Sequence, residues 1–70
     1  MKTLVSSMAG TVFTLNKAVG EEVVTGDVVL VLESMKMEIP VESDQTGKIA
    51  TILVAEGDFV NEGDTLVTFE

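Results

Sequence analysis

The sequence predicts an all-β domain whose two similar halves form sheets that pack face to face around a pseudo-twofold axis. Three observations support this fold class. The chain contains an internal repeat, Gly-Asp and Gly-Glu pairs recur at matching places in both copies, and short β-branched runs lie between them. Glycines also interrupt every stretch of about 10–12 residues that could carry a helical period. Seventy residues suffice for one domain, so residues 1–70 are interpreted as a single unit.

The internal repeat relates residues 9–33 to residues 46–70 by a shift of 37 positions without a gap. Eight positions are identical in the two copies. They are Gly10, Thr14, Ala18, Gly20, Val23, Gly26, Asp27 and Glu33, which correspond to Gly47, Thr51, Ala55, Gly57, Val60, Gly63, Asp64 and Glu70. Neither copy is long enough to bury its apolar face alone, so we expect the two to pack against each other.

The turns are predicted by the glycine pairs. Gly20-Glu21 follows a run of about eight strand-like residues, and Gly26-Asp27 comes six residues later. The same spacing recurs at 57–58 and 63–64. Glycine adopts positive φ without steric cost, and aspartate hydrogen-bonds to nearby backbone, so both pairs are typical of turns.

The strands follow from the β-branched and apolar residues between these turns. In chain order they are expected at Thr3–Met8, Gly10–Lys17, Glu22–Val23, Val28–Ser34, Met37–Ser43, Gly47–Ala55, Phe59–Val60 and Thr65–Phe69. The expected core consists of Val12, Leu15, Val23, Leu30, Leu32, Ile49, Ile52, Val60, Val67 and Phe69.

Composition excludes several classes of function. The chain has no cysteine and no histidine, which removes disulfides, the usual zinc ligands and every Ser-His or Cys-His arrangement. A net charge of −8 disfavours nucleic acid and anionic lipid as partners. There is neither a signal-peptide pattern nor an apolar run of the ~18 residues that a membrane span needs. We therefore expect a cytoplasmic monomer without a metal site or catalytic residues.

One short segment breaks the local rules that the rest of the chain obeys. The predicted axis passes near Ser34-Met35-Lys36-Met37, where strand pairing leaves Met35 and Lys36 as a two-residue loop. Such loops favour Asn-Gly or Asp-Gly because both residues need positive φ. The same pairing places two carboxylates opposite each other, at residues 33 and 38, which is mildly unfavourable. Local rules broken at a single tip indicate function rather than stability.

The segment Glu33-Ser34-Met35-Lys36-Met37-Glu38 resembles the attachment motif of biotinyl domains, whose usual form is Glu-Ala-Met-Lys-Met. The repeat, the turns and the hairpin also resemble the biotinyl/lipoyl attachment domain family, so the likeness covers essentially the whole chain. Within that family the chain is most similar to small free-standing biotin/lipoyl attachment proteins and to biotin carboxyl carrier protein domains. The chain departs from the family pattern in two ways. Ser34 replaces the usual alanine of the motif, and the chain lacks the insertion that forms a protruding thumb in some biotin carboxyl carrier proteins.

This resemblance implies a flattened eight-stranded β-barrel or sandwich of two four-stranded antiparallel sheets. It implies that Lys36 carries covalent biotin, and that the five residues around it contribute to recognition: Glu33, Ser34, Met35, Met37 and Glu38. The implied partners are a biotin protein ligase, a biotin carboxylase and a carboxyltransferase, between which the cofactor carries carboxyl groups. The domain itself is then a carrier and a substrate of enzymes, not an enzyme.

Three alternatives remain open from the residues. A lipoyl carrier, or a protein that accepts either cofactor, would use the same lysine. The related lipoyl domains, however, have Asp-Lys-Ala at this tip, so Met35 and Met37 favour biotin. An enzyme could use Glu33 and Glu38 as paired carboxylates, but an exposed hairpin does not bury a carboxyl group as acid catalysis requires. An unmodified structural β-domain is the third alternative.

Overall fold

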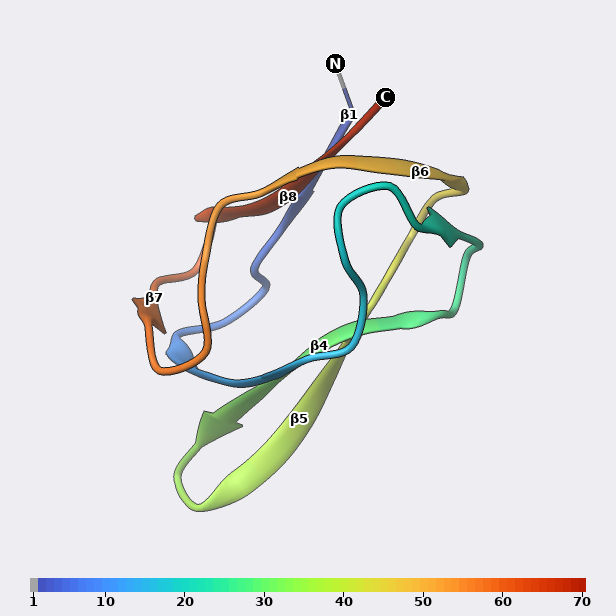
Figure 1. Ribbon diagram of the computed structural model, residues 1–70. Coiled ribbons are helices and arrows are strands. Elements are labelled where there is room, and N and C mark those ends of the chain that lie inside the picture. Colours follow the sequence, from blue (N-terminus) through green and yellow to red (C-terminus); the bar gives the residue numbers. More distant parts are fainter. Residues whose placement is uncertain (1) are drawn as a thin grey trace.

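The computed structural model describes residues 2–70, which form eight strands in two four-stranded antiparallel sheets (Figure 1). No helix occurs in this part of the chain, which confirms the all-β prediction. The strands are β1 (Lys2–Val5), β2 (Gly10–Leu15), β3 (Glu22–Val23), β4 (Val28–Ser34), β5 (Met37–Glu42), β6 (Gly47–Ile52), β7 (Phe59–Val60) and β8 (Thr65–Phe69).

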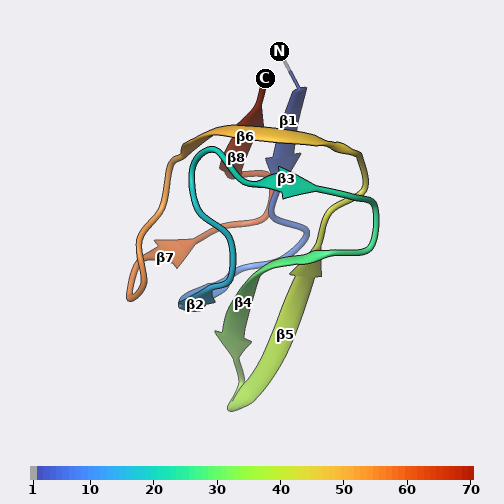
Figure 2. The same ribbon diagram turned by 45° about the vertical axis from the view of Figure 1, so that its right-hand side comes forward.

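The two sheets have the same internal order, as the repeat predicted. One contains β1-β8-β6-β3 and the other β5-β4-β2-β7. The shift of 37 positions exchanges β1 with β5, β8 with β4, β6 with β2 and β3 with β7, so it converts one sheet into the other. Figure 2 shows the two sheets as opposing layers, with the β4–β5 hairpin, which belongs to the second sheet, extending at one end of the molecule. No element is inserted into either unit within residues 2–70, in agreement with the thumbless form.

The turns repeat together with their hydrogen bonds. Gly26 and Gly63 have φ values of 96° and 91°, in the left-handed region that the sequence predicted for them. Gly26 N–H donates to the Ser43 carbonyl and Gly63 N–H to the Ser6 carbonyl, both at 2.8 Å. One residue after each glycine, an aspartate side chain accepts a hydrogen bond from the backbone three residues earlier. The local sequence therefore closes both turns in the same way.

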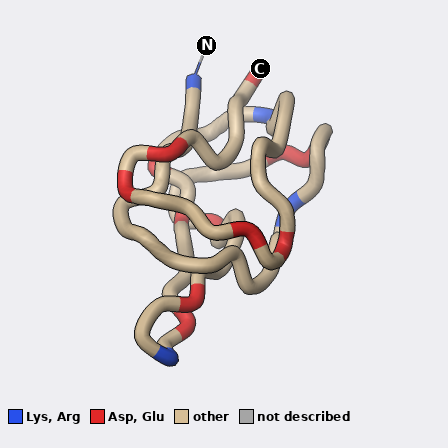
Figure 3. The backbone as a smooth tube through the Cα atoms, turned by 90° about the vertical axis from the view of Figure 1, so that its left-hand side faces the viewer, with Lys and Arg blue, Asp and Glu red and all other residues tan. Residues whose placement is uncertain are grey.

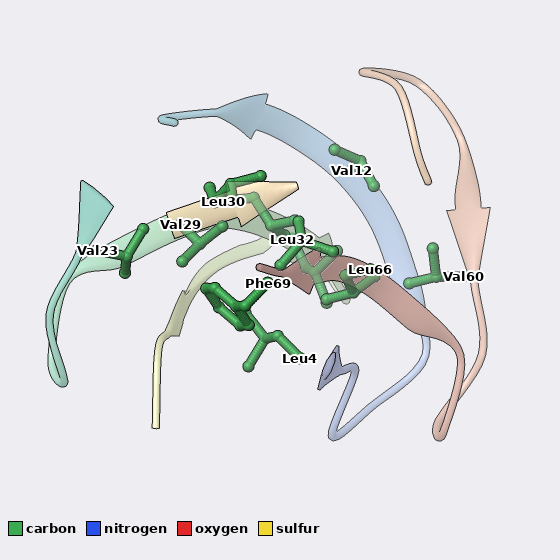
Figure 4. Packing of buried hydrophobic residues seen from close by; sticks show 11 residues of the cluster. Leu4, Val12, Val23, Val29, Leu30, Leu32, Val60, Leu66 and Phe69 are labelled. Carbon is green, nitrogen blue, oxygen red and sulfur yellow. The ribbon is translucent and has the colours of Figure 1, made fainter. Parts of the chain in front are cut away.

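The core lies between the two sheets and is formed almost entirely by aliphatic side chains (Figure 4). Its buried members are Leu4, Val12, Val23, Val29, Leu30, Leu32, Ile49, Val60, Leu66, Val67 and Phe69. Eight of the ten expected core residues are among them. The other two, Leu15 and Ile52, are only partly buried and pack against this cluster. They are the last residues of β2 and β6, so they cover the edge of the core and stay partly exposed.

The sequence prediction missed Leu4, Val29 and Leu66. Leu4 lies in β1, which precedes the first copy of the repeat at residues 9–33. Val29 and Leu66 are repeat partners, and each is the extra residue of a β-bulge: β4 pairs with β5 across Val29, and β8 with β1 across Leu66. A bulge places two consecutive residues against a single partner, so strict alternation fails there and both of these side chains become buried.

Several strands end earlier than expected. β1 ends at Val5 and β5 at Glu42 because the next residues, Ser6 and Ser43, turn the chain. Each serine hydroxyl is buried and donates to the carbonyl two residues later, at Met8 or Gln45. β2 and β6 likewise end at Leu15 and Ile52, before the turns at Gly20 and Gly57. Hydroxyl-to-backbone bonds of this kind compete with strand pairing, which explains the two shorter strands before the serines.

The described chain is elongated, with principal extents of 32 × 18 × 17 Å. Figure 1 shows the β4–β5 hairpin extending at one end, while the first and last described residues lie together at the opposite end. That second end is formed by the β1–β8 pair, which is the repeat partner of the β4–β5 pair. Residues 2–70 include no helix with the length and hydropathy that crossing a membrane would require.

Candidate functional site

The candidate site is the end of the β4–β5 hairpin. β4 and β5 pair antiparallel with Glu33 opposite Glu38 and Ser34 opposite Met37, which leaves Met35 and Lys36 as the connecting loop. This is the pairing predicted from the sequence. The hairpin continues past the body of the two sheets, and Figure 3 shows a basic segment at its end with acidic segments on its two strands. The six residues of the motif are thus gathered at one projecting tip.

The loop has an unusual backbone. Met35 and Lys36 have φ values of 52° and 64°, and they are the only non-glycine residues with positive φ in residues 2–70. Two positive values in succession are what a type I′ turn requires, and they match the twist of the flanking strands. Left-handed backbone costs about 1–2 kcal/mol for each residue that carries a Cβ atom. An observed outlier of this kind indicates that something other than local stability selected Met-Lys.

Lys36 is exposed and unconstrained. Among the residues that the structure describes, the ion pairs within 4 Å involve Lys17, whose Nζ atom lies 3.9 Å from both Glu21 and Asp27. Lys36 takes part in none of them, although Glu33 and Glu38 lie in the hairpin within three residues of it. A tight loop therefore presents one amine to solvent.

The methionines on either side of Lys36 do not pack into the core. Met35 is 90% exposed and Met37 59% exposed, so both side chains are open to solvent. Ser34, opposite Met37, is half-buried. Flexible thioether side chains that stay in solvent are suited to contacts with another protein, because they adapt to surfaces of different shape.

Glu33 and Glu38 face each other across the strands, and both are exposed. Their carboxylates are therefore solvated, without the burial that tunes a catalytic acid. Within residues 2–70 there is no group of three or more acidic side chains placed to hold a metal ion, and no pocket is present. The structure instead provides an exposed lysine in the loop, with the carboxylates of Glu33 and Glu38 on the two strands behind it.

Replacing Met35 with asparagine should stabilise the domain. Asparagine tolerates the left-handed region better than methionine does, so the substitution relieves part of the loop strain. We expect the free energy of unfolding to rise by about 0.5–1 kcal/mol and the melting temperature by about 3–6 °C. Thermal and urea unfolding followed by circular dichroism measure both quantities. Met37→Asn is the matched control. It lies in regular strand and should give no gain, and equal responses of the two variants would contradict the strain interpretation.

Comparison with known proteins places this geometry in a family. Residues 2–69 match the Biotin_lipoyl family, described as "Biotin-requiring enzyme". A biotin/lipoyl attachment protein of Bacillus subtilis (strain 168) is 43% identical over 65 residues, which cover 93% of this chain and 89% of that protein. The biotin carboxyl carrier protein of Streptococcus mutans is 35% identical over 66 residues, covering 94% of this chain and 51% of that protein.

Solved structures agree with these relatives. The crystal structure of Kluyveromyces lactis urea carboxylase contains a region that superimposes on this chain with a TM-score of 0.90 at 35% sequence identity. The matched region covers 99% of this chain but 6% of the urea carboxylase chain. A single-chain, multi-domain long-chain acyl-CoA carboxylase gives the same TM-score at 31% identity and 7% coverage of its chain. From the family match, the relatives and the shared fold, it follows that this chain belongs to the biotin/lipoyl attachment family.

Proposed function

We propose that this chain is a carrier domain that accepts biotin in amide linkage on Lys36 and moves it between the active sites of a biotin-dependent carboxylase. The observation that carries the proposal is the exposed Lys36 at the end of a strained two-residue loop. Two similarities support it. The relatives include biotin carboxyl carrier proteins and carboxylase subunits, and the structural neighbours are carboxylases.

The residues fit covalent attachment rather than enclosure. Lys36 projects from a hairpin, and its amine has no carboxylate within ion-pair distance in the described chain. In the proposed reaction, the biotin carboxylate attacks the α-phosphorus of ATP in a biotin protein ligase, which forms an acyl-adenylate and releases pyrophosphate. The Lys36 amine loses a proton to the ligase and attacks the acyl carbon, so a C–N bond forms and AMP leaves. This chain supplies the position of the amine, and the ligase supplies the activation.

The fold then determines how the attached group can move. When bound, biotin supplies a ureido nitrogen that can carry a carboxyl group. Lys36 lies in the loop of the β4–β5 hairpin, and this hairpin extends at the end of the molecule opposite the first and last described residues (Figure 1). A tethered group meets each active site as an intramolecular reactant, with an effective concentration far above its bulk value. The domain thus serves as a rigid mount for a flexible arm.

The direct test is intact-mass spectrometry after incubation with a biotin protein ligase, ATP and biotin. We expect a mass increase of one biotinyl group, and peptide mapping should place it on Lys36. Lys2, Lys17 and Lys48 act as internal controls, because they are the remaining lysines of the chain. An unchanged mass, or a label spread over several lysines, contradicts the proposal.

A lipoyl carrier is the second candidate, favoured by one relative that is named as a biotin/lipoyl attachment protein. We propose that the exposed Met35 and Met37 direct the choice toward biotin. The double change Met35→Asp with Met37→Ala makes the tip resemble that of lipoyl domains. It should lower the ratio of biotin to lipoate attachment by about tenfold without unfolding the domain, since about 1.4 kcal/mol of lost contact energy suffices for that change.

The experiment is a competition in which biotin and lipoate ligases act together with both cofactors, and the products are counted by intact mass. The single change Ser7→Ala is the control, because Ser7 is exposed and lies outside the hairpin. An unchanged ratio in the double variant would show that selection is made elsewhere on the surface, with Glu33, Ser34 and Glu38 as the next residues to replace.

A further inference from the structure

The pseudo-twofold repeat provides an internal comparison of the two outer sheet faces. Both halves make the same turns, bulges and strand pairs, so a difference between repeat partners is not required by the fold. Two exposed residues of the sheet that carries the hairpin are more apolar than their partners on the other sheet. Phe13 corresponds to Ala50, and Phe59 corresponds to Glu22.

Both phenylalanines are exposed, Phe13 at 50% and Phe59 at 65%. Phe13 is the extra residue of the bulge in β2, where Val12 pairs with Leu32 and Thr14 with Val31. Its side chain faces solvent while Val12 is buried. The partner positions show that alanine and glutamate satisfy the same backbone roles. Two exposed aromatic side chains on one face of so small a protein therefore indicate a contact surface rather than a folding requirement.

Phe59 is connected with the hairpin through strand pairing, and Phe13 lies on β2, the strand between β7 and β4. Phe59 is paired with Thr11, Thr11 with Glu33, and Glu33 with Glu38, so the four form one cross-strand row. Directly opposed residues in antiparallel strands point to the same face, and adjacent strands lie about 4.8 Å apart, so the row spans about 14 Å. The next pair of the hairpin is Ser34 with Met37, after which the chain enters the loop that carries Lys36.

We infer that this surface, the aromatic flank (Phe13, Phe59, Glu33 and Glu38), docks the ligase that loads Lys36. The inference rests on the proposed function. The unmodified amine sits on a stem of four carbons, so the ligase must come into contact with the hairpin and the sheet face beside it before the reaction. Once biotin is attached, the side chain of Lys36 with its cofactor is longer and can reach an active site from a greater distance. Close contact between this domain and the carboxylase is then less necessary. The loading step is therefore the one that most needs the flank.

Charge and size define the partner surface. The phenylalanines are bordered by the carboxylates of Glu33 and Glu38 on a protein of net charge −8, so the complementary surface is apolar with lysine or arginine at its rim. A second copy of this chain is a poor occupant because the pair would carry twice −8. A stable dimer also needs an interface of about 800 Å² per partner, whereas a transient encounter with an enzyme needs less. The area for a dimer is one fifth of the 4084 Å² surface of this chain, far more than two phenylalanines expose.

The repeat itself supplies the test variants. Phe13→Ala and Phe59→Glu, singly and together, give the flank the residues of the opposite sheet. Initial rates of biotin attachment to Lys36, measured by intact mass against the concentration of the domain, separate KM from kcat. We expect the double variant to raise KM at least tenfold with kcat within twofold of the parent. Added salt should raise the KM of the parent, because it screens the acidic border.

Matched controls replace equally exposed apolar residues elsewhere. Leu53 and Val24, 57% and 54% exposed, follow β6 and β3 of the other sheet. Leu53→Asn introduces the residue of its repeat partner, Asn16, and Val24→Glu adds the same charge as Phe59→Glu. Both should keep KM within twofold of the parent. Far-ultraviolet circular dichroism establishes that each variant is folded, and Phe59→Gln replaces Phe59→Glu if the latter unfolds.

Each outcome has a separate meaning. If the flank variants keep the KM of the parent, or if the control variants raise KM equally, the docking inference is overturned. Labelling of the parent at Lys36 would still leave the proposed function intact. Failure of the parent to be labelled at all rejects the proposed function instead. Sedimentation that shows a parental dimer, abolished by Phe59→Glu, would assign the flank to self-association and overturn the ligase as its occupant.

Discussion

Lys36→Arg is expected to abolish biotin attachment completely while the domain stays folded. Amide formation needs a neutral amine at the moment of attack, and the guanidinium group of arginine stays protonated under all conditions in which the protein is native. The rest of the tip is unchanged, because arginine has a similar length and the same charge. Lys36 is exposed and makes no ion pair within residues 2–70, so the free energy of unfolding should change by no more than about 0.5 kcal/mol.

Intact mass after exhaustive treatment with ligase, ATP and biotin measures attachment, and urea unfolding measures stability. Lys48→Arg is the matched control, since Lys48 is also exposed and lies in regular strand β6. It should be labelled as fast as the parent. Attachment that persists in Lys36→Arg, at Lys2, Lys17 or Lys48, would show that the acceptor has been assigned to the wrong lysine.

The largest effect on stability is expected for Phe69→Ala. Phe69 is 1% exposed and belongs to the core between the sheets (Figure 4). A Cβ atom placed on Gly47 would lie 3.4 Å from the Phe69 ring, so the ring packs directly over the glycine backbone. Removing a buried phenylalanine side chain costs about 3–5 kcal/mol. Small domains have about 0.05–0.15 kcal/mol of stability per residue, or about 3.5–10.5 kcal/mol for a 70-residue chain, so this loss is a large share of the total.

Urea unfolding followed by circular dichroism should show Phe69→Ala largely unfolded, or with a much lower midpoint, at room temperature. Phe59→Ala removes the same atoms from an exposed site and is the matched control. Its cost should stay near 0.5 kcal/mol, as for most surface substitutions. Equal losses in the two variants would mean that the core is not organised around the contact between β6 and β8. The same pair of variants tests the flank as well, because Phe59→Ala is expected to impair loading without impairing folding.

The repeat also explains why this fold can present a lysine at one end. The β4–β5 and β1–β8 pairs are equivalent under the pseudo-twofold relation, yet the first is closed by the Met35-Lys36 loop and the second holds the first and last described residues. The tip and the ends of the described chain therefore face away from each other (Figure 1). A linker joined at those ends would leave the hairpin free to enter an active site. This separation results from the topology and does not depend on any particular side chain.

The sequence by itself determined the turns, the two equivalent halves and the register of the hairpin. These features follow from local signals. Glycine at positive φ and aspartate bound to its own backbone specify a turn without reference to distant residues, and the recurrence of the signals after 37 positions revealed the symmetry. The mismatch between Met-Lys and the backbone that a two-residue loop requires also indicated a functional role for the tip that contains Lys36.

Only the tertiary structure decided which side chains break the alternation of the strands. The bulges at Val29 and Leu66 bury consecutive residues, and the bulge at Phe13 leaves an aromatic ring exposed. A bulge is set by how one strand pairs with a neighbour contributed by another part of the chain, so no local pattern specifies it. Burial near strand ends, as for Leu15 and Ile52, depends in the same way on where the opposing sheet ends. The core edge and the flank beside the hairpin are therefore products of packing between the two halves.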